Sequence, residues 1–210
     1  MYVPAAFAVT DPVEIEAILG RLDFGCLVTH DADGLFASHL PFLYDAERRV
    51  LRGHLARANP QWRRAETAEA LAIFQGPNAY VSPGWYPSKG EHGRVVPTWN
   101  YEVVHVYGRL DWRMDEGWLI GFLAALTDRF ERRRAAPWAI TDAPVDYVRG
   151  LAGAIVGLEL QAERVEAKRK LSQNRSEPDR MGVAAALAAS DDPSERALGT
   201  IMGAEVSGAD

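Results

Sequence analysis

Short apolar runs separated by turn residues occupy the first quarter of the chain, and this pattern predicts strands. The runs are Phe24–His30, Leu35–Tyr44 and Val50–Leu55. The turn Asp31–Gly34 contains a glycine that supplies the left-handed backbone conformation of a hairpin. Pro41 cannot donate a ladder hydrogen bond, so the second run should lie at an edge or carry a bulge. The three runs therefore predict an antiparallel meander.

Further along the chain, apolar and β-branched positions predict more strand. We expect strand at Leu71–Phe74, Ala79–Val81 and Val95–Leu110, and the clearest alternation lies at Ile155–Val165. In that last run every second side chain is apolar, while glycine, glutamate and glutamine fill the positions between them. The total of about six or seven short strands favours a small closed barrel.

Helical periodicity is found between and after these strands. A helix should begin after Thr10 and Asp11, another short one should cover Gln61–Ala70, and a longer one should span Asp115–Arg134. We expect Pro178 to break the chain before two Ala-rich helices, MGVAAALAAS and PSERALGTIMG. The fold class is therefore predicted as mainly β (α+β), with helices flanking the sheet.

The stretch Phe74–Arg109 is unusually aromatic for a connection rich in proline and glycine. Flat aromatic surface beside Lys89, Arg94 and Asn100 would suit a planar ligand with a polar tail. The alternative is a long ordered loop that covers its own core. The pattern of residues leaves both interpretations open.

The sequence GHLARANPQW predicts a strand that ends directly at a helix start. Asn59 is a preferred N-cap residue, Pro60 suits the first helical position, and Arg57 comes just before them. Backbone N–H groups and a guanidinium together favour an anion, phosphate above all. The alternative is a plain strand-to-helix connection with a solvated arginine.

The basic cluster at Glu131–Arg134 also has two interpretations. It could contact nucleic acid, or its positive charges could simply stabilise the negative end of the helix dipole at a helix C-terminus.

Composition narrows the possible functions. The 210 residues are 48% hydrophobic and 25% charged, with a net charge of −6 and a pI near 5.4. This acidity argues against a general nucleic-acid-binding surface but allows a local basic patch. One cysteine, Cys26, excludes a disulfide within the chain. The five histidines are scattered, so no metal site is predicted, and no standard catalytic motif is present. With no apolar run of membrane-spanning length, we expect a cytoplasmic protein.

Six motifs in order resemble one known family. They are MYVPAAF, SHLPF, GHLARANPQW, FQGPNAYVSPGWY, VPTWNYEVVHVYG and KLSQNR. Together they resemble the PaiB-type FMN-binding negative transcriptional regulators, which belong with the split-barrel flavin proteins. The resemblance covers Met1 to about Arg175, and it departs from the pattern at Ala167, where glycine is expected.

The resemblance implies a six-stranded antiparallel FMN-binding split barrel at residues 1–175, and a homodimer with FMN at the subunit interface. The helical pattern after it predicts a C-terminal helical extension at residues 176–210 packed on the same domain, and the lack of a spanning apolar run predicts no membrane contact. Arg57, Ala58, Asn59 and Gln61 would hold the phosphate. Other cofactor-binding residues would be Ser38, His39, Leu40 and His54 from the same subunit, and Trp99, Asn100, Lys170, Ser172, Gln173 and Asn174 from its partner.

Three functions follow from these expectations. The first is a flavin-binding negative transcriptional regulator that acts through DNA, which the net charge does not support, or through a protein partner. The second is an FMN-dependent oxidoreductase: a flavin reductase, a small-amine oxidase or a haem-degrading enzyme. Flavin supplies its own redox chemistry, so such an enzyme needs few catalytic side chains. The third is a cofactor-free dimerisation module on the same fold.

Overall fold

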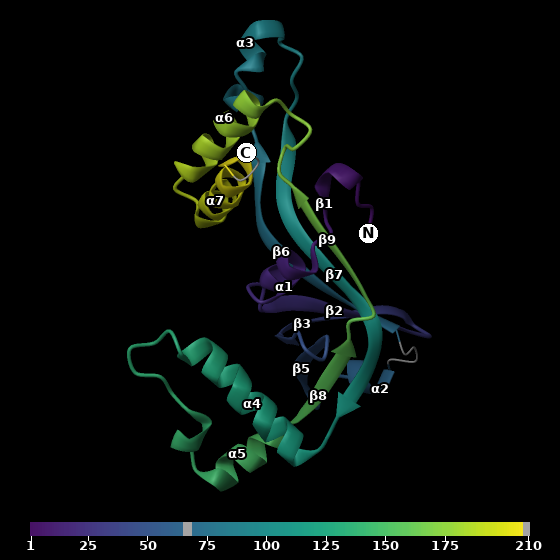
Figure 1. The fold of residues 1–210 in the computed structure, drawn as a ribbon. Helices are drawn as coiled ribbons and strands as arrows, with labels where there is room; N and C mark the ends of the chain where they lie inside the picture. Colours follow the sequence, from purple (N-terminus) through teal and green to yellow (C-terminus); the bar gives the residue numbers. More distant parts are fainter. Residues whose placement is uncertain (65–68, 208–210) are drawn as a thin grey trace. The chain divides into compact units, whose positions relative to one another are not determined.

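The computed structural model describes residues 1–64 and 69–207 (Figure 1). Clustering of contacts along the chain separates two compact units, each built from discontinuous segments. Unit 1 consists of Met1–Ile15, Gln75–Val104 and Glu166–Asp210. Unit 2 consists of Glu16–Phe74 and His105–Val165. Two long strands, β6 (Glu69–Val81) and β7 (Thr98–Arg113), contain residues of both units.

Unit 2 contains two antiparallel hairpins where one continuous meander was predicted. Strand β2 (Phe24–Asp31) pairs antiparallel with β3 (Gly34–Pro41), and Gly34 adopts the left-handed φ of 112° that this hairpin turn requires. The next hairpin joins β4 (Leu43–Asp45) to β5 (Val50–Ala56). Strand β5 pairs in turn with β8 (Ile155–Gln161), and β8 pairs with the end of β7. The inner face of these strands forms the core, with Leu27, Phe42, Leu51, Phe74 and Leu158 fully buried.

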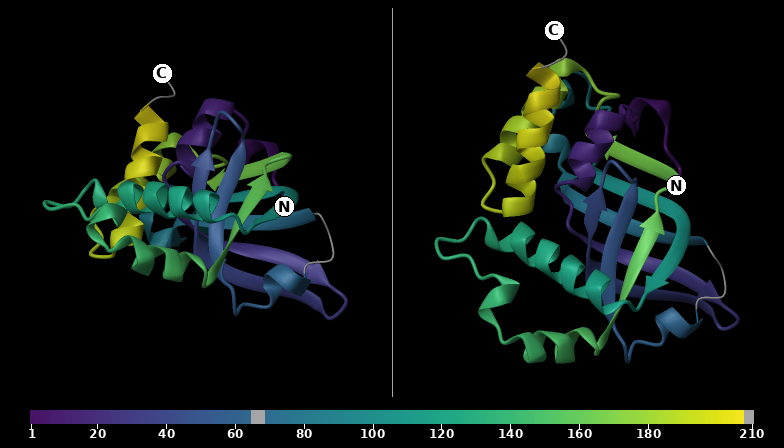
Figure 2. Two further views of the ribbon diagram at one scale, coloured as in Figure 1. Left: turned by 90° about the horizontal axis from the view of Figure 1, so that it is seen from below. Right: turned by 60° about the horizontal axis from the view of Figure 1, so that its bottom comes forward.

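Helices of unit 2 pack against this sheet. Helix α4 (Glu116–Glu131) begins where Asp115 Oδ1 accepts a hydrogen bond from the backbone N–H of Trp118 at 2.8 Å. Trp118 then fills the space above Gly157, where an added Cβ would lie 2.1 Å from its ring. Figure 2 shows α4 followed by a long connection and the amphipathic helix α5 (Val145–Ala152). A 3-10 turn at Ile140–Asp142 lies in that connection, and the short α2 (Gln61–Arg64) follows β5.

Unit 1 packs two C-terminal helices on strand residues. Helices α6 (Glu177–Ala188) and α7 (Pro193–Ser207) cross closely, because an added Cβ at Gly199 would lie 2.5 Å from the backbone N of Ala188. Their apolar faces bury Tyr86. The remaining elements are η1 (Ala5–Phe7), β1 (Ala8–Val9), η2 (Pro83–Trp85), α3 (Ser88–His92) and β9 (Arg164–Lys170), with α1 (Pro12–Leu19) spanning the boundary between the units.

Several predicted elements are confirmed, including the β2–β3 hairpin, α4, α6 and α7. The predicted three-stranded meander is wrong, because its second run divides into β3 and β4, which lie at opposite ends of the path of paired strands. The described residues form nine strands, whereas six were predicted. Two of the additional strands, β1 and β4, have only two and three residues, and a third arises because β9 is separate from β8. The break between β8 and β9 lies at residues 162–163. The path of paired strands starts at β3 and ends at β4, so the sheet is open where a closed barrel was expected.

Three local predictions are wrong. Strand β6 runs without interruption through Gln75–Asn78, which was predicted as a break. Glu69 and Ala70 belong to that strand and not to the helix predicted at Gln61–Ala70, whose residues 65–68 lie outside the described chain. Pro178 does not break the chain, because it lies in the first turn of α6 after the N-cap residue Ser176.

Candidate functional site

A pocket of about 510 Å³ opens in unit 2 between β3, β5 and the start of β8. This volume lies within the range of small-molecule sites. We call it the β3–β5 pocket, and it brings together five residues that the sequence predicted as cofactor-binding. Its lining residues are Ala37, Ser38, His39, Leu40, Pro41, His54, Leu55, Ala56, Asn59 and Ile155.

Asn59 shapes one side of this pocket. Its Nδ2 donates a hydrogen bond to Ser38 Oγ at 2.8 Å, and its Oδ1 accepts one from the backbone N–H of Gln61 at 2.9 Å. The same side chain thus caps α2 and holds the hydroxyl of β3 in place. The sequence predicted the Asn-Pro cap but did not predict the contact between Asn59 and Ser38.

His54 forms part of the opposite wall, on β5. Its ring lies edge-on to Phe122 of α4, with the ring centroids 5.6 Å apart. Its Nδ1 is buried and has no hydrogen-bond partner among the residues that the structure describes. Burial lowers the pKa of His54 below its ordinary value, because the low-dielectric surroundings disfavour the imidazolium. The pocket therefore presents a neutral imidazole at pH 7.

Arg57 follows the pocket residue Ala56 in the chain, and its guanidinium is held by the backbone of the pocket residue Ile155. Arg57 Nη2 donates a hydrogen bond to the carbonyl of Ile155 at 3.2 Å, and its backbone N–H donates to Ala154 O at 2.8 Å. The Nε–H is buried and lacks a partner in the described part of the chain. Because a buried donor without a partner is costly, this guanidinium is suited to bind an anion.

The backbone around Asn59 offers less to an anion than the sequence suggested. The N–H of Asn59 donates to Ala56 O, the N–H of Gln61 donates to the Asn59 side chain, and Pro60 has none. The Gln61 side chain is fully buried and points into the sheet, where its Nε2 lies within 3.1–3.3 Å of three acceptors on β2 and β3. Gln61 therefore anchors α2 to the sheet.

The other predicted site residues belong to unit 1. Asn100 is fully buried, and its Nδ2 donates to Ser172 Oγ at 3.0 Å. Ser172 adopts a left-handed φ of 64°, an uncommon conformation for a serine that this buried pair supports. Both residues use their polar groups within unit 1.

Four further predicted residues surround this pair. Lys170 Nζ donates to Thr98 Oγ1 and to the Trp99 carbonyl, both at 2.6 Å. Burial and the nearby cations Lys168 and Arg175 lower the pKa of Lys170. Gln173 closes a local turn through its bond to the Leu171 N–H, while the Trp99 side chain is half exposed and Asn174 is exposed. These residues belong to unit 1, whereas the residues that line the β3–β5 pocket belong to unit 2.

The aromatic stretch after β6 also belongs to unit 1. Tyr86 is buried in the core cluster with Leu171, Val183 and Leu187, and Trp85 packs against the same cluster. This supports the interpretation of an ordered segment that covers its own core.

Comparison with known proteins decides the family. A family model described as "Putative FMN-binding domain" matches residues 1–164. "Protease synthase and sporulation protein PAI 2" of Bacillus subtilis (strain 168) is 34% identical over 205 residues, which cover 96% of each chain. The chain belongs to this FMN-binding family.

Solved structures support the fold of this FMN-binding family member. The FAD and heme binding protein from Mycobacterium smegmatis gives a TM-score of 0.57 at 18% identity, covering 77% of this chain and 72% of that one. The flavocytochrome Anf3 from Azotobacter vinelandii gives a TM-score of 0.57 at 14% identity, and the match covers 78% of this chain and 69% of that one. At these identities the likeness shows a shared fold, a mainly antiparallel sheet with flanking helices.

The residues of the β3–β5 pocket fit the chemistry of a flavin. Leu40, Leu55 and Ile155 provide apolar surface for a planar ring system, while Ser38 and His54 provide polar atoms beside it. The guanidinium of Arg57 adds a positive charge beside the pocket residue Ile155, to whose carbonyl it donates at 3.2 Å. Among residues 1–64 and 69–207, no helix is long and apolar enough to span a membrane.

Proposed function

We propose that this chain binds FMN in the β3–β5 pocket. The observation that carries the proposal is the meeting of Ser38, His39, Leu40, His54 and Asn59 in one pocket, with the guanidinium of Arg57 bonded to the carbonyl of the lining residue Ile155. Membership of an FMN-binding family supports it. Bound FMN would supply the redox-active ring, and the protein would supply the binding and the orientation.

Each side chain has a distinct task in this proposal. Arg57 binds the phosphate, because its planar guanidinium matches phosphate oxygens and its Nε–H has no partner within the described chain. Asn59 and Ser38 keep the pocket open through their mutual hydrogen bond. Residues 1–175 form the flavin-binding domain and residues 176–210 its helical extension. The contribution of a partner subunit through Trp99, Asn100, Lys170, Ser172, Gln173 and Asn174 stays a prediction.

We further propose that the FMN-bound protein acts as a negative transcriptional regulator. The similarity to the motifs of that group supports this role. An FMN-dependent oxidoreductase is the second candidate, and one observation favours it: His54, whose pKa is lowered by burial, lines the pocket with its imidazole in the neutral form at pH 7. Such a group can accept a proton from a substrate bound beside the cofactor.

Replacement of Arg57 tests the phosphate assignment. Arg57→Ala should weaken FMN binding by about tenfold to a hundredfold, because a charge-assisted hydrogen bond to phosphate is lost. Riboflavin lacks the phosphate, so its affinity should change little. The measurement is fluorescence titration of both flavins against the wild-type protein and the variant.

Arg63 provides a matched control on the neighbouring helix turn. It is exposed and stacks on Trp62, with its Cζ 4.6 Å from the ring centroid. Arg63→Ala should leave both affinities unchanged. Equal losses of FMN and riboflavin affinity in Arg57→Ala would exclude Arg57 from phosphate binding.

The two roles are separated by two measurements on the FMN-loaded protein. A regulator that binds DNA directly should show affinity for operator DNA that falls steeply with salt concentration. An oxidoreductase should bleach the flavin absorbance when NADH or NADPH is added, and should recover it on turnover of an acceptor. Bleaching with turnover and no salt-dependent DNA binding would favour the enzyme.

A further inference from the structure

Helix α4 places two aromatic rings beside His54 of the β3–β5 pocket. Phe122 is 2% exposed, and its ring meets the His54 ring edge-on, with the centroids 5.6 Å apart. Trp118 stacks on Phe122, with the centroids 5.3 Å apart and the ring planes 13° from parallel. We call Trp118 and Phe122 the α4 aromatic pair. Neither ring lines the pocket, so the pair acts on a ligand there only through His54.

The α4 aromatic pair fits here because position 157 on β8 is a glycine. Gly157 lies directly opposite His54 in the antiparallel register, where side chains share one face of the sheet. A Cβ added at Gly157 would lie 2.1 Å from the Trp118 ring. The indole therefore fills the place of a side chain opposite His54, and such close packing fixes the orientation of the rings.

Trp118 is anchored at the polar edge of its indole. Its Nε1–H donates to Glu159 Oε1 at 3.0 Å, and Arg113 Nε donates to Glu159 Oε2 at 3.0 Å. The Glu159 carboxylate, which lies on the same sheet face as His54, is thereby engaged by other donors. Arg52, two positions before His54 on that face, carries donors only.

The buried side of the His54 ring determines where its proton lies. Nδ1 is buried and has no hydrogen-bond partner among residues 1–64 and 69–207. Because burial also lowers the pKa of His54, the ring is neutral at pH 7 and carries one N–H. A buried N–H without an acceptor is rare, since it forfeits the hydrogen bond that water would provide. The proton therefore belongs on Nε2.

We propose that the α4 aromatic pair positions His54 so that its Nε2–H donates a hydrogen bond to the flavin ring system. The inference rests on the FMN site proposed above. With Nδ1 buried, Nε2 is the ring nitrogen left to meet a ligand, and flavin ring nitrogens and carbonyl oxygens accept hydrogen bonds. His54 then binds the ring end of FMN, while Arg57 binds its phosphate.

In this proposal Phe122 and Trp118 are positioning residues, and His54 is a hydrogen-bond donor. A proton acceptor at Nε2 would need the opposite tautomer, with its N–H buried on Nδ1. The tautomer of His54 therefore also bears on the oxidoreductase alternative. A donor favours flavin binding, whereas an acceptor favours proton transfer.

Nitrogen-15 NMR of the histidine rings measures this tautomer in the FMN-free wild-type chain. His54→Gln identifies the His54 signals by their loss. At neutral pH we expect a protonated Nε2 and an unprotonated Nδ1 in His54. A proton on Nδ1 would overturn the proposal. The measurement needs no flavin, so its result is independent of whether FMN binds.

Phe122→Leu tests whether the α4 aromatic pair acts through His54. Loss of the aromatic ring lets water reach Nδ1 and stabilise the imidazolium, so the His54 signals should titrate at a higher pH than in the wild type. Phe130→Leu is the matched control, because Phe130 lies on the same helix and is 42% exposed. Titration of His54 at the same pH in the wild type and in Phe122→Leu would overturn the positioning role.

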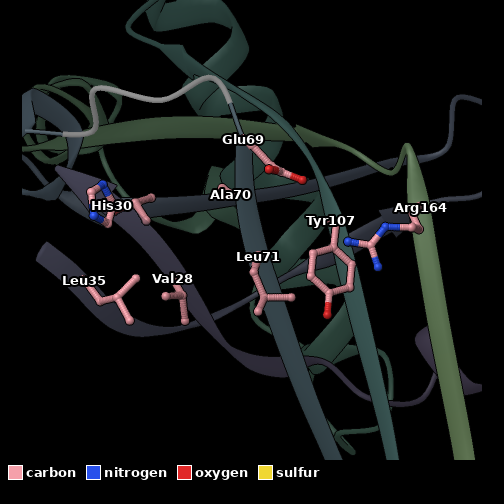
Figure 3. A pocket seen from close by; sticks show the side chains of 9 residues that line it. Val28, His30, Leu35, Glu69, Ala70, Leu71, Tyr107 and Arg164 are labelled. Atoms are coloured by element: carbon pink, nitrogen blue, oxygen red, sulfur yellow. The ribbon is translucent and has the colours of Figure 1, made fainter. Parts of the chain in front are cut away.

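His30 provides an internal reference in these spectra. It is exposed on β2 and lines a different pocket, of about 350 Å³, that shares no residue with the β3–β5 pocket. Figure 3 shows His30 at the far end of that pocket from Arg164, which stacks on Tyr107 with Cζ 3.5 Å from the ring centroid. The His30 signals should be the same in the wild type and in Phe122→Leu. If they change, the substitution disturbs the whole sheet, and the tautomer of the wild type then decides the proposal.

Flavin titrations test the contact with the ring. Phe122→Leu should weaken FMN and riboflavin binding by the same factor, about fivefold, because both contain the ring system that His54 contacts. Arg57→Ala should weaken FMN binding alone. Unchanged flavin affinities in Phe122→Leu, or a loss confined to FMN, would overturn the contact with the ring. Binding of neither flavin to the wild type would overturn the proposed function and leave the NMR result on the tautomer standing.

Discussion

The β3–β5 pocket of unit 2 and the Asn100–Ser172 pair of unit 1 both contain predicted cofactor-binding residues, but their polar atoms are used differently. In unit 1, the Asn100 amide has no exposed surface and is bonded to Ser172. In unit 2, His54 Nδ1 and Arg57 Nε are buried without a partner in the described chain. Buried groups that are paired stabilise a fold, whereas an unpaired buried group costs free energy unless water or a ligand satisfies it. The same residue types can therefore serve either purpose.

A buried charge network reinforces this contrast in unit 1. Arg169 Nε donates to Glu102 Oε2 at 2.7 Å, and the guanidinium also pairs with Glu14 and Glu205. Burial alone would lower the pKa of Arg169, but the three carboxylates raise it instead. The guanidinium and its three carboxylate partners all belong to unit 1, so the evident role of this network is to stabilise that unit.

The largest expected effect comes from this network. Glu102→Ala should lower the free energy of unfolding by about 3 kcal/mol, because a buried guanidinium loses its fully buried partner. Chemical denaturation measures the change. The control is Glu116→Ala, an exposed carboxylate paired with Arg149, which should cost less than about 1 kcal/mol. Similar costs for the two variants would contradict the structural role of the network.

Asn100→Ala should have the next largest effect. It leaves the buried Ser172 hydroxyl without its partner and should lower the free energy of unfolding by about 2 kcal/mol. Asn174→Ala is the exposed control and should change little. FMN titration of the folded Asn100→Ala protein then sharpens the comparison. Unchanged FMN affinity would support a purely structural role for Asn100. A clear loss of FMN affinity would support the predicted contact from a partner subunit and would contradict the contrast between the two units.

The smallest effect concerns pH and the pocket histidine. Burial holds the pKa of His54 below that of the unfolded chain, so the unfolded chain binds this proton first as the pH falls. The stability linked to His54 is therefore fully present above about pH 6.5 and is lost as the pH falls towards the folded-state pKa. The loss cannot exceed about 1.4 kcal/mol per pH unit.

Denaturation curves at several pH values, recorded for the wild type and His54→Gln, measure this dependence. The variant lacks the titrating group, so its stability should fall less steeply between neutral and mildly acidic pH. Parallel pH profiles for the two proteins would show that His54 titrates alike in the folded and unfolded states.

Local sequence signals predicted most strands and helices because each depends on neighbours in the chain. Gly34 closes the β2–β3 turn, as its residue type indicated, and α4 lies within the predicted span Asp115–Arg134. Strand β6 was interrupted in the prediction because Gly76 and Pro77 ordinarily weaken a strand. In the structure Gly76 is needed there, since an added Cβ would lie 2.8 Å from the buried Glu102 carboxylate. Such a long-range contact leaves no local signal.

The candidate site was predictable to a similar extent. The Asn-Pro cap and the SHLPF strand were legible as motifs, and the structure brings Asn59, Ser38 and His39 to one pocket. The sequence could not show that Gln61 points into the sheet, because that depends on acceptors from β2 and β3. The stacking of Arg164 on Tyr107 was missed because the two residues are far apart in the chain and belong to no motif.

The contact between Gly157 and Trp118 has a consequence for how this family can evolve. The indole occupies the space that the missing side chain leaves, stacks on Phe122 at 5.3 Å and donates to Glu159 Oε1 at 3.0 Å. Phe122 in turn contacts His54 in the pocket wall. Relatives with a larger residue at position 157 should therefore carry a smaller one at position 118. The two positions are expected to change together, and a change in either one alone should be selected against.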